Sequence, residues 1–364
     1  MLGWHEVERL PIPARSQSKV DDGDEVGHSV ALSGDRIVVG APKRKRDDGA
    51  LAGAIVLRRG ARSAVERELR VKGAQLGFGV GVSGNDVLVG ASFASAGREE
   101  SGALFVYAGS GEGSKLTGSG VSARSGLGDR IAVSGATAIV GQFASVDQGG
   151  AWVFARGDKG WREVTRLRTQ KAGKQSGFGG AVALDGDRAV VGAAFATATA
   201  KQSGAVWVFE RNAGEFRETA KLEPKEATEY LHFGEAVAVS GDTIVVSASL
   251  ISAASIHVFR ANREQHWSEV QQLAAPPGAR AFGRALALSA NELLVGDPQA
   301  RDGAGVVWVY THKGPTFELA GEIVPRVPSK EAWFGASIAL EGTTAVIGAP
   351  LENTRAGAAY LFAR

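Results

Sequence analysis

The chain of 364 residues contains no cysteine and a single methionine, and such absences narrow the possible classes of protein. Without cysteine there is neither a disulfide framework nor a thiolate metal site. No apolar stretch approaches the roughly 18 residues of a membrane-spanning helix, so we expect no insertion into a membrane. The first ten residues, MLGWHEVERL, lack the basic and apolar regions of a signal peptide. Either the chain is intracellular or a leader has been removed.

Charge is also scarce, since charged residues make up 22% of the chain and the formal net charge is +2. This balance provides no general attraction for nucleic acid, which we do not expect as a partner. Glycine, in contrast, occurs 50 times. Abundant glycine between short apolar runs indicates an all-β protein with many tight turns.

One unit of sequence recurs along the whole chain. Its clearest copy, residues 178–211, reads FGGAVALDGDRAVVGAAFATATAKQSGAVWVFER, with three alternating apolar runs separated by turn and loop residues. Such runs predict three strands. Seven copies begin near residues 26, 76, 127, 178, 233, 282 and 334, a spacing typical of propeller blades. In the second copy a gapless alignment begins at Leu76-Gly77, and the Phe78-Gly79 pair lies out of frame.

Most copies are followed by a fourth, more polar segment, such as WREVTRL from Trp161 and WSEVQQL from Trp267; the counterpart around Lys115-Leu116 is weak. Alternating charges suit an outer edge strand. The last copy has no such segment, whereas WHEVERL at residues 4–10 has no copy before it. We therefore predict one all-β domain over residues 1–364, a seven-bladed β-propeller of four-stranded antiparallel blades. The strand at 4–10 completes the last blade and closes the ring.

Phe-Gly followed by Val-Gly-Ala-Pro within one repeat resembles the FG-GAP repeat; Gly-Ala-Pro itself is kept at residues 40–42 and 348–350. The resemblance implies the propeller at the head of integrin α chains, which many bacterial proteins share. In the integrin form, Asp-rich calcium loops join the first two strands of several blades. Here that link is as short as Gly34-Asp35, and one carboxylate cannot supply the six to eight oxygens that calcium takes. The sequence resembles the short-loop bacterial form, and we expect no cofactor.

The residue after each Phe-Gly begins the innermost strand, near the mouth of the axial channel. Because apolar residues are the default of the repeat, ionisable residues at this position point to a polar ligand pocket. The alternative is a water-lined channel, which is common in propellers. The seven copies hold His28, Phe78, Asp129, Gly180, Glu235, Arg284 and Ala336, of which His28, Asp129, Glu235 and Arg284 are ionisable.

Two charged segments flank the first two predicted strands of the first blade: an acidic run precedes them and a basic run follows them. The basic run comprises Lys43, Arg44, Lys45 and Arg46. It can bind an anionic polymer or an acidic protein, or it can pair with the acidic run that precedes the blade. No aromatic residues are interleaved to stack bases, which argues against nucleic acid. The acidic run includes Asp21, Asp22 and Asp24 and is a weak calcium candidate, because its spacing matches no known calcium loop.

Signatures of an enzyme are lacking, since no nucleophile elbow, phosphate loop or metal dyad is present. We expect no catalytic residues. The leading hypothesis is a monomeric, non-catalytic module that binds a protein or a glycan. By resemblance it lies at the cell surface, in the periplasm or outside the cell, with the cytoplasm left open. The alternatives are a hydrolase or lyase that uses the polar residues at the channel mouth, and a structural domain of a larger surface protein.

Overall fold

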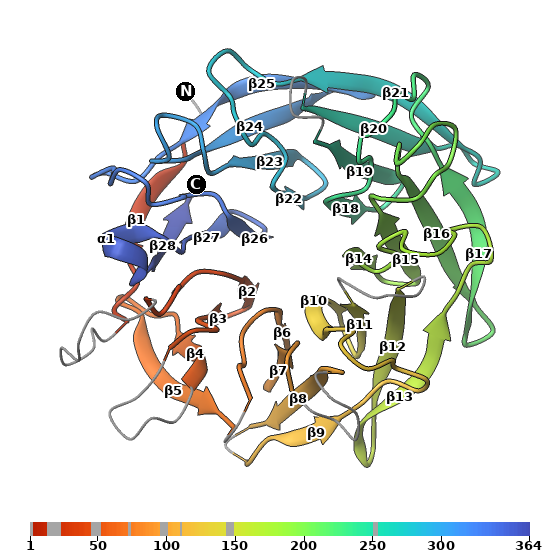
Figure 1. Ribbon diagram of the computed structural model, residues 1–364. Coiled ribbons are helices and arrows are strands. Elements are labelled where there is room, and N and C mark those ends of the chain that lie inside the picture. The colour runs from red at the N-terminus through yellow and green to blue at the C-terminus, as the bar shows by residue number, and fades with distance from the viewer. Residues whose placement is uncertain are drawn as a thin grey trace.

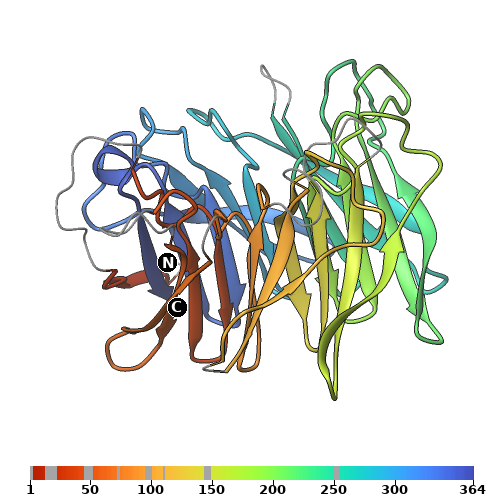
Figure 2. The ribbon, with the colours of Figure 1, turned by 60° about the horizontal axis from the view of Figure 1, so that its bottom comes forward.

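The chain forms a closed ring of seven four-stranded antiparallel sheets, the blades, around a central axis (Figure 1). The computed structural model describes residues 3–12, 23–44, 52–71, 74–94, 101–109, 111–142, 149–249 and 254–364. In Figure 2 the tight hairpins project from the lower side of the ring and the longer connections lie on the upper side. The sequence-based prediction of a seven-bladed propeller is confirmed.

Each repeat contributes its strands from the axis outwards. The innermost strands are β2 (Val30–Ser33), β6 (Val80–Ser83), β10 (Leu127–Ser134), β14 (Ala181–Asp185), β18 (Val237–Ser240), β22 (Ala285–Leu288) and β26 (Ser337–Glu341). The second strands are β3 (Arg36–Gly40), β7 (Asp86–Ala91), β11 (Thr137–Gln142), β15 (Arg188–Ala193), β19 (Thr243–Ala248), β23 (Glu292–Asp297) and β27 (Thr344–Ala349).

The third and fourth strands of the blades are on average longer than the two inner strands, and the fourth strands, at the rim, are more polar. The third strands are β4 (Ala52–Arg58), β8 (Ala103–Ala108), β12 (Gly150–Gly157), β16 (Ala205–Asn212), β20 (Ser255–Ala261), β24 (Val306–Lys313) and β28 (Ala358–Ala363). The outer strands are β5 (Ala64–Arg70), β9 (Ser114–Leu116), β13 (Gly160–Leu167), β17 (Glu215–Leu222), β21 (Trp267–Ala274), β25 (Thr316–Ile323) and β1 (His5–Arg9). The weak segment around Lys115 is the short β9 (Ser114–Leu116), and among the described residues the only helical turn is α1 (Glu352–Arg355).

The N-terminal strand closes the ring, as the sequence predicted. Strand β1 pairs antiparallel with β28, from His5 opposite Ala363 to Arg9 opposite Tyr360, and completes the sheet β1-β28-β27-β26. The main chain of Leu10 continues this pairing, because its N–H donates to the carbonyl of Ala359 at 2.9 Å. The last blade is therefore built from both ends of the chain.

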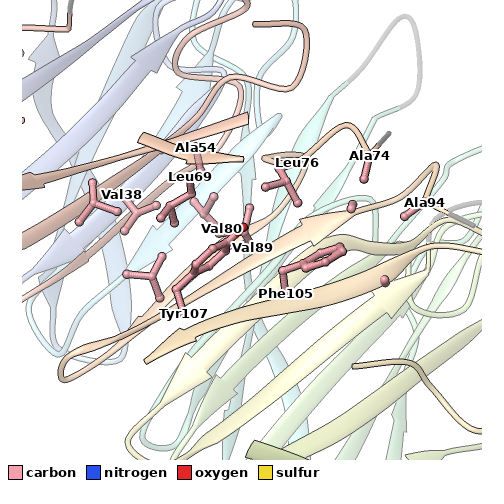
Figure 3. Close-up of a cluster of buried hydrophobic side chains, with 14 of the residues drawn as sticks. Val38, Ala54, Leu69, Ala74, Leu76, Val80, Val89, Ala94, Phe105 and Tyr107 are labelled. Atoms are coloured by element: carbon pink, nitrogen blue, oxygen red, sulfur yellow. The ribbon is translucent and has the colours of Figure 1, made fainter. Parts of the chain in front are cut away.

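The hydrophobic core lies between blades. Seven clusters of buried side chains each join two neighbouring blades, because both faces of every sheet are apolar. Figure 3 shows the cluster between the first and second blades, which includes Leu69, Leu76 and Phe105. The Gly77 N–H donates to the carbonyl of Gly90 at 2.9 Å, as Gly179 does to Gly192 in the fourth blade. This equivalence confirms that Leu76-Gly77 sets the register of the second copy.

The glycine that ends the second strand lets neighbouring blades approach closely at the axis. A methyl group added to Gly90 would lie 1.7 Å from the carbonyl oxygen of Gly128 in the next blade, and one added to Gly192 would lie 2.2 Å from that of Gly234. Any side chain there must push the two backbones apart. The requirement explains why the Val-Gly-Ala corner recurs; the fifth copy differs, with Ser247 at this position.

Arginines at the ends of third strands connect neighbouring blades on the hairpin side. Arg211 donates to Thr137 of the preceding blade at 3.0 Å, and Arg59 donates to Thr344 at 2.7 Å. Arg156 forms an ion pair of 2.8 Å with the buried Asp86. The repeat in sequence shows these arginines only as polar strand ends, because their partners lie one blade away. Among the described residues, no helix is long and apolar enough to span a membrane.

Candidate functional site

The residues that follow Phe-Gly in the seven copies come together at the mouth of the channel. Two adjoining cavities lie there, of about 280 and 490 Å³. Six of the seven positions line the first cavity, and Gly180 lines the second. The four ionisable residues His28, Asp129, Glu235 and Arg284 line both cavities. The structure therefore brings these four predicted residues to one site; their role as ligand-binding residues stays a prediction.

Two ion pairs fix the charged side chains of the mouth. Arg284 Nη1 lies 3.1 Å from Glu235 Oε1, so the pair joins the fifth and sixth blades. The Ser249 hydroxyl donates to the other oxygen of Glu235. On the opposite part of the ring, Arg130 Nη1 lies 2.6 Å from Asp129 Oδ2. The side chains remain partly open to solvent, with Arg284 48% and Asp129 15% exposed, so a ligand can reach them.

Aromatic rings stand on two sides of these ion pairs. On one side Phe78 contacts His28 edge-on, with ring centroids 5.5 Å apart, and Phe93 at 5.2 Å. On the other side Phe195 contacts His232 edge-on at 5.1 Å. Phe93 and Phe195 are 52% and 39% exposed. The mouth thus combines aromatic walls with charged groups, which is the composition of many small-ligand sites.

The channel below the mouth is apolar at its first level. The third residue after the Phe-Gly pair, or its equivalent, lines the first cavity in all seven blades. These residues are Val30, Val80, Ile131, Val182, Val237, Leu286 and Ile338. Each also packs into the core between its own blade and the preceding one. Ser29 and Ser337 line the same cavity, so its lining is largely but not wholly aliphatic, and the water-lined channel stays an alternative.

The larger cavity is open beside the fourth blade, because the residues of this blade that line it have small side chains or none. Its residue after Phe-Gly is Gly180, and the neighbouring Gly177 and Ala194 are also small; all three line the cavity of about 490 Å³. In the second blade the equivalent position holds Phe78, which fills the corresponding space with an aromatic ring. The blade with the plainest sequence therefore shapes the site by the absence of a side chain.

The basic run of the first blade is paired within the protein where the structure describes it. Arg44 is buried and lies 3.0 Å from Asp24 and 2.8 Å from Glu68. Lys43 Nζ lies 3.0 Å from Glu25. The alternative that these cations neutralise the acidic run is thus seen for Lys43 and Arg44. Residues Lys45 and Arg46, like Asp21 and Asp22, lie outside the described residues.

Glu25 connects this charged cluster to the mouth. Its carboxylate lies 2.7 Å from Arg355 and 3.7 Å from the ring nitrogen of His28. Burial raises the pKa of Glu25, but hydrogen bonds from His28, Lys43 and Arg355 outweigh burial and lower its pKa to about 2. The carboxylate is therefore ionised at neutral pH and holds His28 at the edge of the cavity. Within the part of the chain that the structure describes, no group of three or more acidic or histidine side chains forms a metal site.

A buried Ser–His–Glu arrangement lies in the fifth blade, away from the mouth. The Ser255 hydroxyl is 3.1 Å from His257 Nε2, and His257 Nδ1 is 2.7 Å from Glu269. The geometry is that of a hydrolase triad, but Ser255 and His257 are only 4% and 2% exposed. No substrate can reach the hydroxyl in this conformation. Glu269 also accepts a hydrogen bond from the main-chain N–H of Lys225 at 2.8 Å, so the arrangement fixes a loop.

This arrangement predicts that stability falls in mild acid. Burial lowers the pKa of His257, although the hydrogen bond and charge of Glu269 raise it in part. The unfolded chain then binds a proton near pH 6.5 that the folded chain takes up only at lower pH. Stability is therefore full above about pH 6.5 and decreases below it. Urea unfolding at pH 8 and pH 5.5 measures this loss.

The variant His257→Gln is the matched control for that measurement. Glutamine can still donate to Glu269 and accept from Ser255 but does not titrate. We expect the difference in free energy of unfolding between pH 8 and pH 5.5 to become smaller. An unchanged difference would assign the pH dependence to other groups, such as His312, whose pKa burial and Arg260 also lower.

Sequence reasoning missed several residues of the mouth. Arg130 and Ser249 were not singled out, because each occupies a repeat position that is small or apolar in most other copies. Phe93 and Phe195 share one position, three residues after the glycine that ends the second strand, where the first and last blades have Lys43 and Leu351. Comparison of this column between copies would have shown the aromatic pair.

Fold and site together define a seven-bladed β-propeller with a ligand-sized cavity at the channel mouth. The sequence model of the FG-GAP repeat matches residues 17–55, 161–209, 216–259 and 319–362. The chain therefore carries FG-GAP repeats in four regions and folds as a seven-bladed β-propeller. Each of the four matched regions runs from an outer segment, or the chain just before a blade, into the next three strands.

Solved structures with the same fold have little sequence in common with the chain. A protein from Lactobacillus plantarum superimposes with a TM-score of 0.57 and 17% identity over 85% of this chain and 86% of its own. A candidate 6-phosphogluconolactonase from Bacteroides uniformis superimposes with a TM-score of 0.58 and 12% identity, over 86% of this chain and 89% of its own. A chain of the mitotic checkpoint complex superimposes with a TM-score of 0.61 and 13% identity, over 98% of both chains. Comparison with curated protein sequences finds no match. These similarities support the fold.

Proposed function

We propose that this propeller is a non-catalytic binding module that takes its ligand, a glycan or a protein segment, at the mouth of the channel. The observation that carries the proposal is the convergence of the variable repeat position on one cavity of about 490 Å³. This volume lies within the roughly 300–1,000 Å³ of typical ligand pockets. The features that the copies share serve packing between blades or tight turns, whereas one position at which they differ lines the cavity.

The ion pairs favour binding over catalysis. Each of the two carboxylates, Asp129 and Glu235, is held by an arginine. They belong to the third and fifth blades, and each faces its own arginine rather than the other acid. A hydrolase or lyase needs an acid and a base directed at one bond of the substrate. The resemblance to FG-GAP proteins supports a place at the cell surface or outside the cell, where a rigid recognition module has a use.

The variant Gly180→Phe tests the site by filling the larger cavity. The equivalent position of the second blade already holds Phe78, so the fold accommodates a phenylalanine there. We expect the labelled wild-type protein to bind members of an array of immobilised glycans and peptides, and Gly180→Phe to lose at least 90% of that signal. Urea unfolding of both proteins checks that the variant is folded.

Two further variants locate the loss. Leu319→Ala removes a 50% exposed side chain on the outer strand β25 and should leave the signal unchanged. Lys43→Ala tests the charged loop of the first blade and should also leave it unchanged. Binding that survives Gly180→Phe would place the ligand elsewhere on the propeller. Turnover of a bound glycan or ester by the wild type would instead support the hydrolase or lyase.

A further inference from the structure

The charges at the mouth cancel, which limits the kind of ligand that fits. Asp129 with Arg130 and Glu235 with Arg284 form two neutral pairs. A charged ligand must compete with the partner already in place. A hydroxyl group both donates and accepts hydrogen bonds, so it can bridge an arginine N–H and a carboxylate oxygen without separating them. The two ion pairs at the mouth therefore favour an uncharged ligand rich in hydroxyl groups.

Two exposed phenylalanines provide the other half of the recognition. Large aromatic side chains are usually buried, yet Phe93 and Phe195 are 52% and 39% exposed. Phe195 lines the larger cavity, and Phe93 contacts Phe78, which lines both cavities. Each is braced edge-on by another ring, so little conformational entropy is lost when a ligand stacks on it. A ligand ring with an apolar C–H face can stack on these phenylalanines, while polar groups at its edge contact the ion pairs.

The depth of the site limits how much of a ligand can enter. Seven aliphatic side chains, among them Val80, Val237 and Ile338, line the first level of the channel below the polar ring. A hydroxyl group that enters this level exchanges hydration for mainly aliphatic neighbours, which is unfavourable. Only one end of a hydroxyl-rich chain therefore enters favourably.

From these features we infer that the mouth binds the terminal ring of a neutral saccharide. The ring stacks on Phe195 and its hydroxyls bridge the Glu235–Arg284 pair. The inference rests on the proposed function, since it names the ligand class of the same site. It assigns Phe195 as the stacking residue and the two ion pairs as the groups that select an uncharged sugar.

The test uses neutral hexose disaccharides and trisaccharides, with sulfated and uronic-acid counterparts, in saturation-transfer NMR and titration calorimetry. We expect the neutral compounds to bind the wild type, with a dissociation constant that changes less than about twofold between 0.05 and 0.5 M NaCl, because salt screens only charged partners. Phe195→Ala should weaken binding at least tenfold. Phe195→Trp, which keeps an aromatic face, should retain it, and Leu319→Ala should bind as the wild type does.

The outcomes separate this inference from the proposed function. If only sulfated or uronic-acid sugars bind, and salt weakens them strongly, the neutral saccharide is wrong although the mouth remains a binding site. The same holds if only peptides bind and Gly180→Phe removes their signal. If every ligand found binds Gly180→Phe and Phe195→Ala as tightly as the wild type, both the inference and the proposed function fail.

Discussion

Deletion of residues 3–12 is expected to destabilise the propeller by about 4 kcal/mol or more, beyond the range of most single substitutions. The deletion removes strand β1 and leaves the edge of β28 unpaired. It also removes Leu10, which is 2% exposed, and the carboxylate of Glu8, which accepts a hydrogen bond from Ser63 of the first blade at 2.9 Å. Urea unfolding followed by tryptophan fluorescence measures the loss, and size-exclusion chromatography detects association through the open edge.

A circular permutant separates the role of the strand from its position in the chain. Gly3 lies beside the other end, since a methyl group on it would be 3.9 Å from Cγ of Arg364. A chain that begins at residue 23 and carries residues 3–12 after Arg364, through a short turn, can form the same β1–β28 pair as a hairpin. We expect it to regain most of the stability that the deletion loses. Equal instability of permutant and deletion would show that pairing with β28 is not what closes the ring.

The substitution Gly90→Ala is expected to destabilise the protein by about 3 kcal/mol, at the upper end of overpacking effects. The added methyl group meets the carbonyl oxygen of Gly128 at 1.7 Å, and both atoms belong to backbones that adjacent strands hold in place. Gly157→Ala is the matched control, because its nearest contact would be 4.0 Å away and the residue is exposed. We expect the control to change the free energy of unfolding by less than about 0.5 kcal/mol.

The equivalent position of the fifth blade gives this prediction a natural comparison. Ser247 stands there in the wild type, opposite Gly283 of the next blade. Ser247→Gly should therefore be tolerated better than Gly90→Ala. If Gly90→Ala unfolds at the same urea concentration as the wild type, the close approach of neighbouring blades at the axis does not require glycine.

The fold was predictable from the sequence because the residues that determine it recur in every repeat or in most of them. Phe-Gly, the short hairpins and the Val-Gly-Ala corner each occur in register across the copies, and the unpaired segment at residues 4–10 indicated how the ring closes. The same comparison placed His28, Asp129, Glu235 and Arg284 near the axis. A feature that recurs at fixed spacing can be recognised without knowledge of three-dimensional contacts.

The chemistry of the site was not predictable, because it depends on contacts between copies. The sequence did not show that Glu235 faces Arg284 across a blade boundary. It offered the pairing of the basic run with the acidic run that contains Asp24, but it showed neither the burial of Arg44 nor its second partner, Glu68. Gly180 was not among the four residues predicted to bind a ligand, since a missing side chain has a meaning only when its neighbours in space are known. Side-chain partners that belong to different repeats leave no local pattern.

The way the ring is closed has a consequence for how the protein folds. The pair His5 and Ala363 joins residues 358 positions apart, and contacts of such separation form slowly because a long loop must be closed first. During synthesis β1 is made well before its partner β28. At about 5–20 residues per second, β1 waits on the order of 20–70 s for a partner. Its charged residues Glu6, Glu8 and Arg9 oppose pairing of an exposed edge with other chains, so the composition that suits an outer strand also suits a strand whose partner is not yet made.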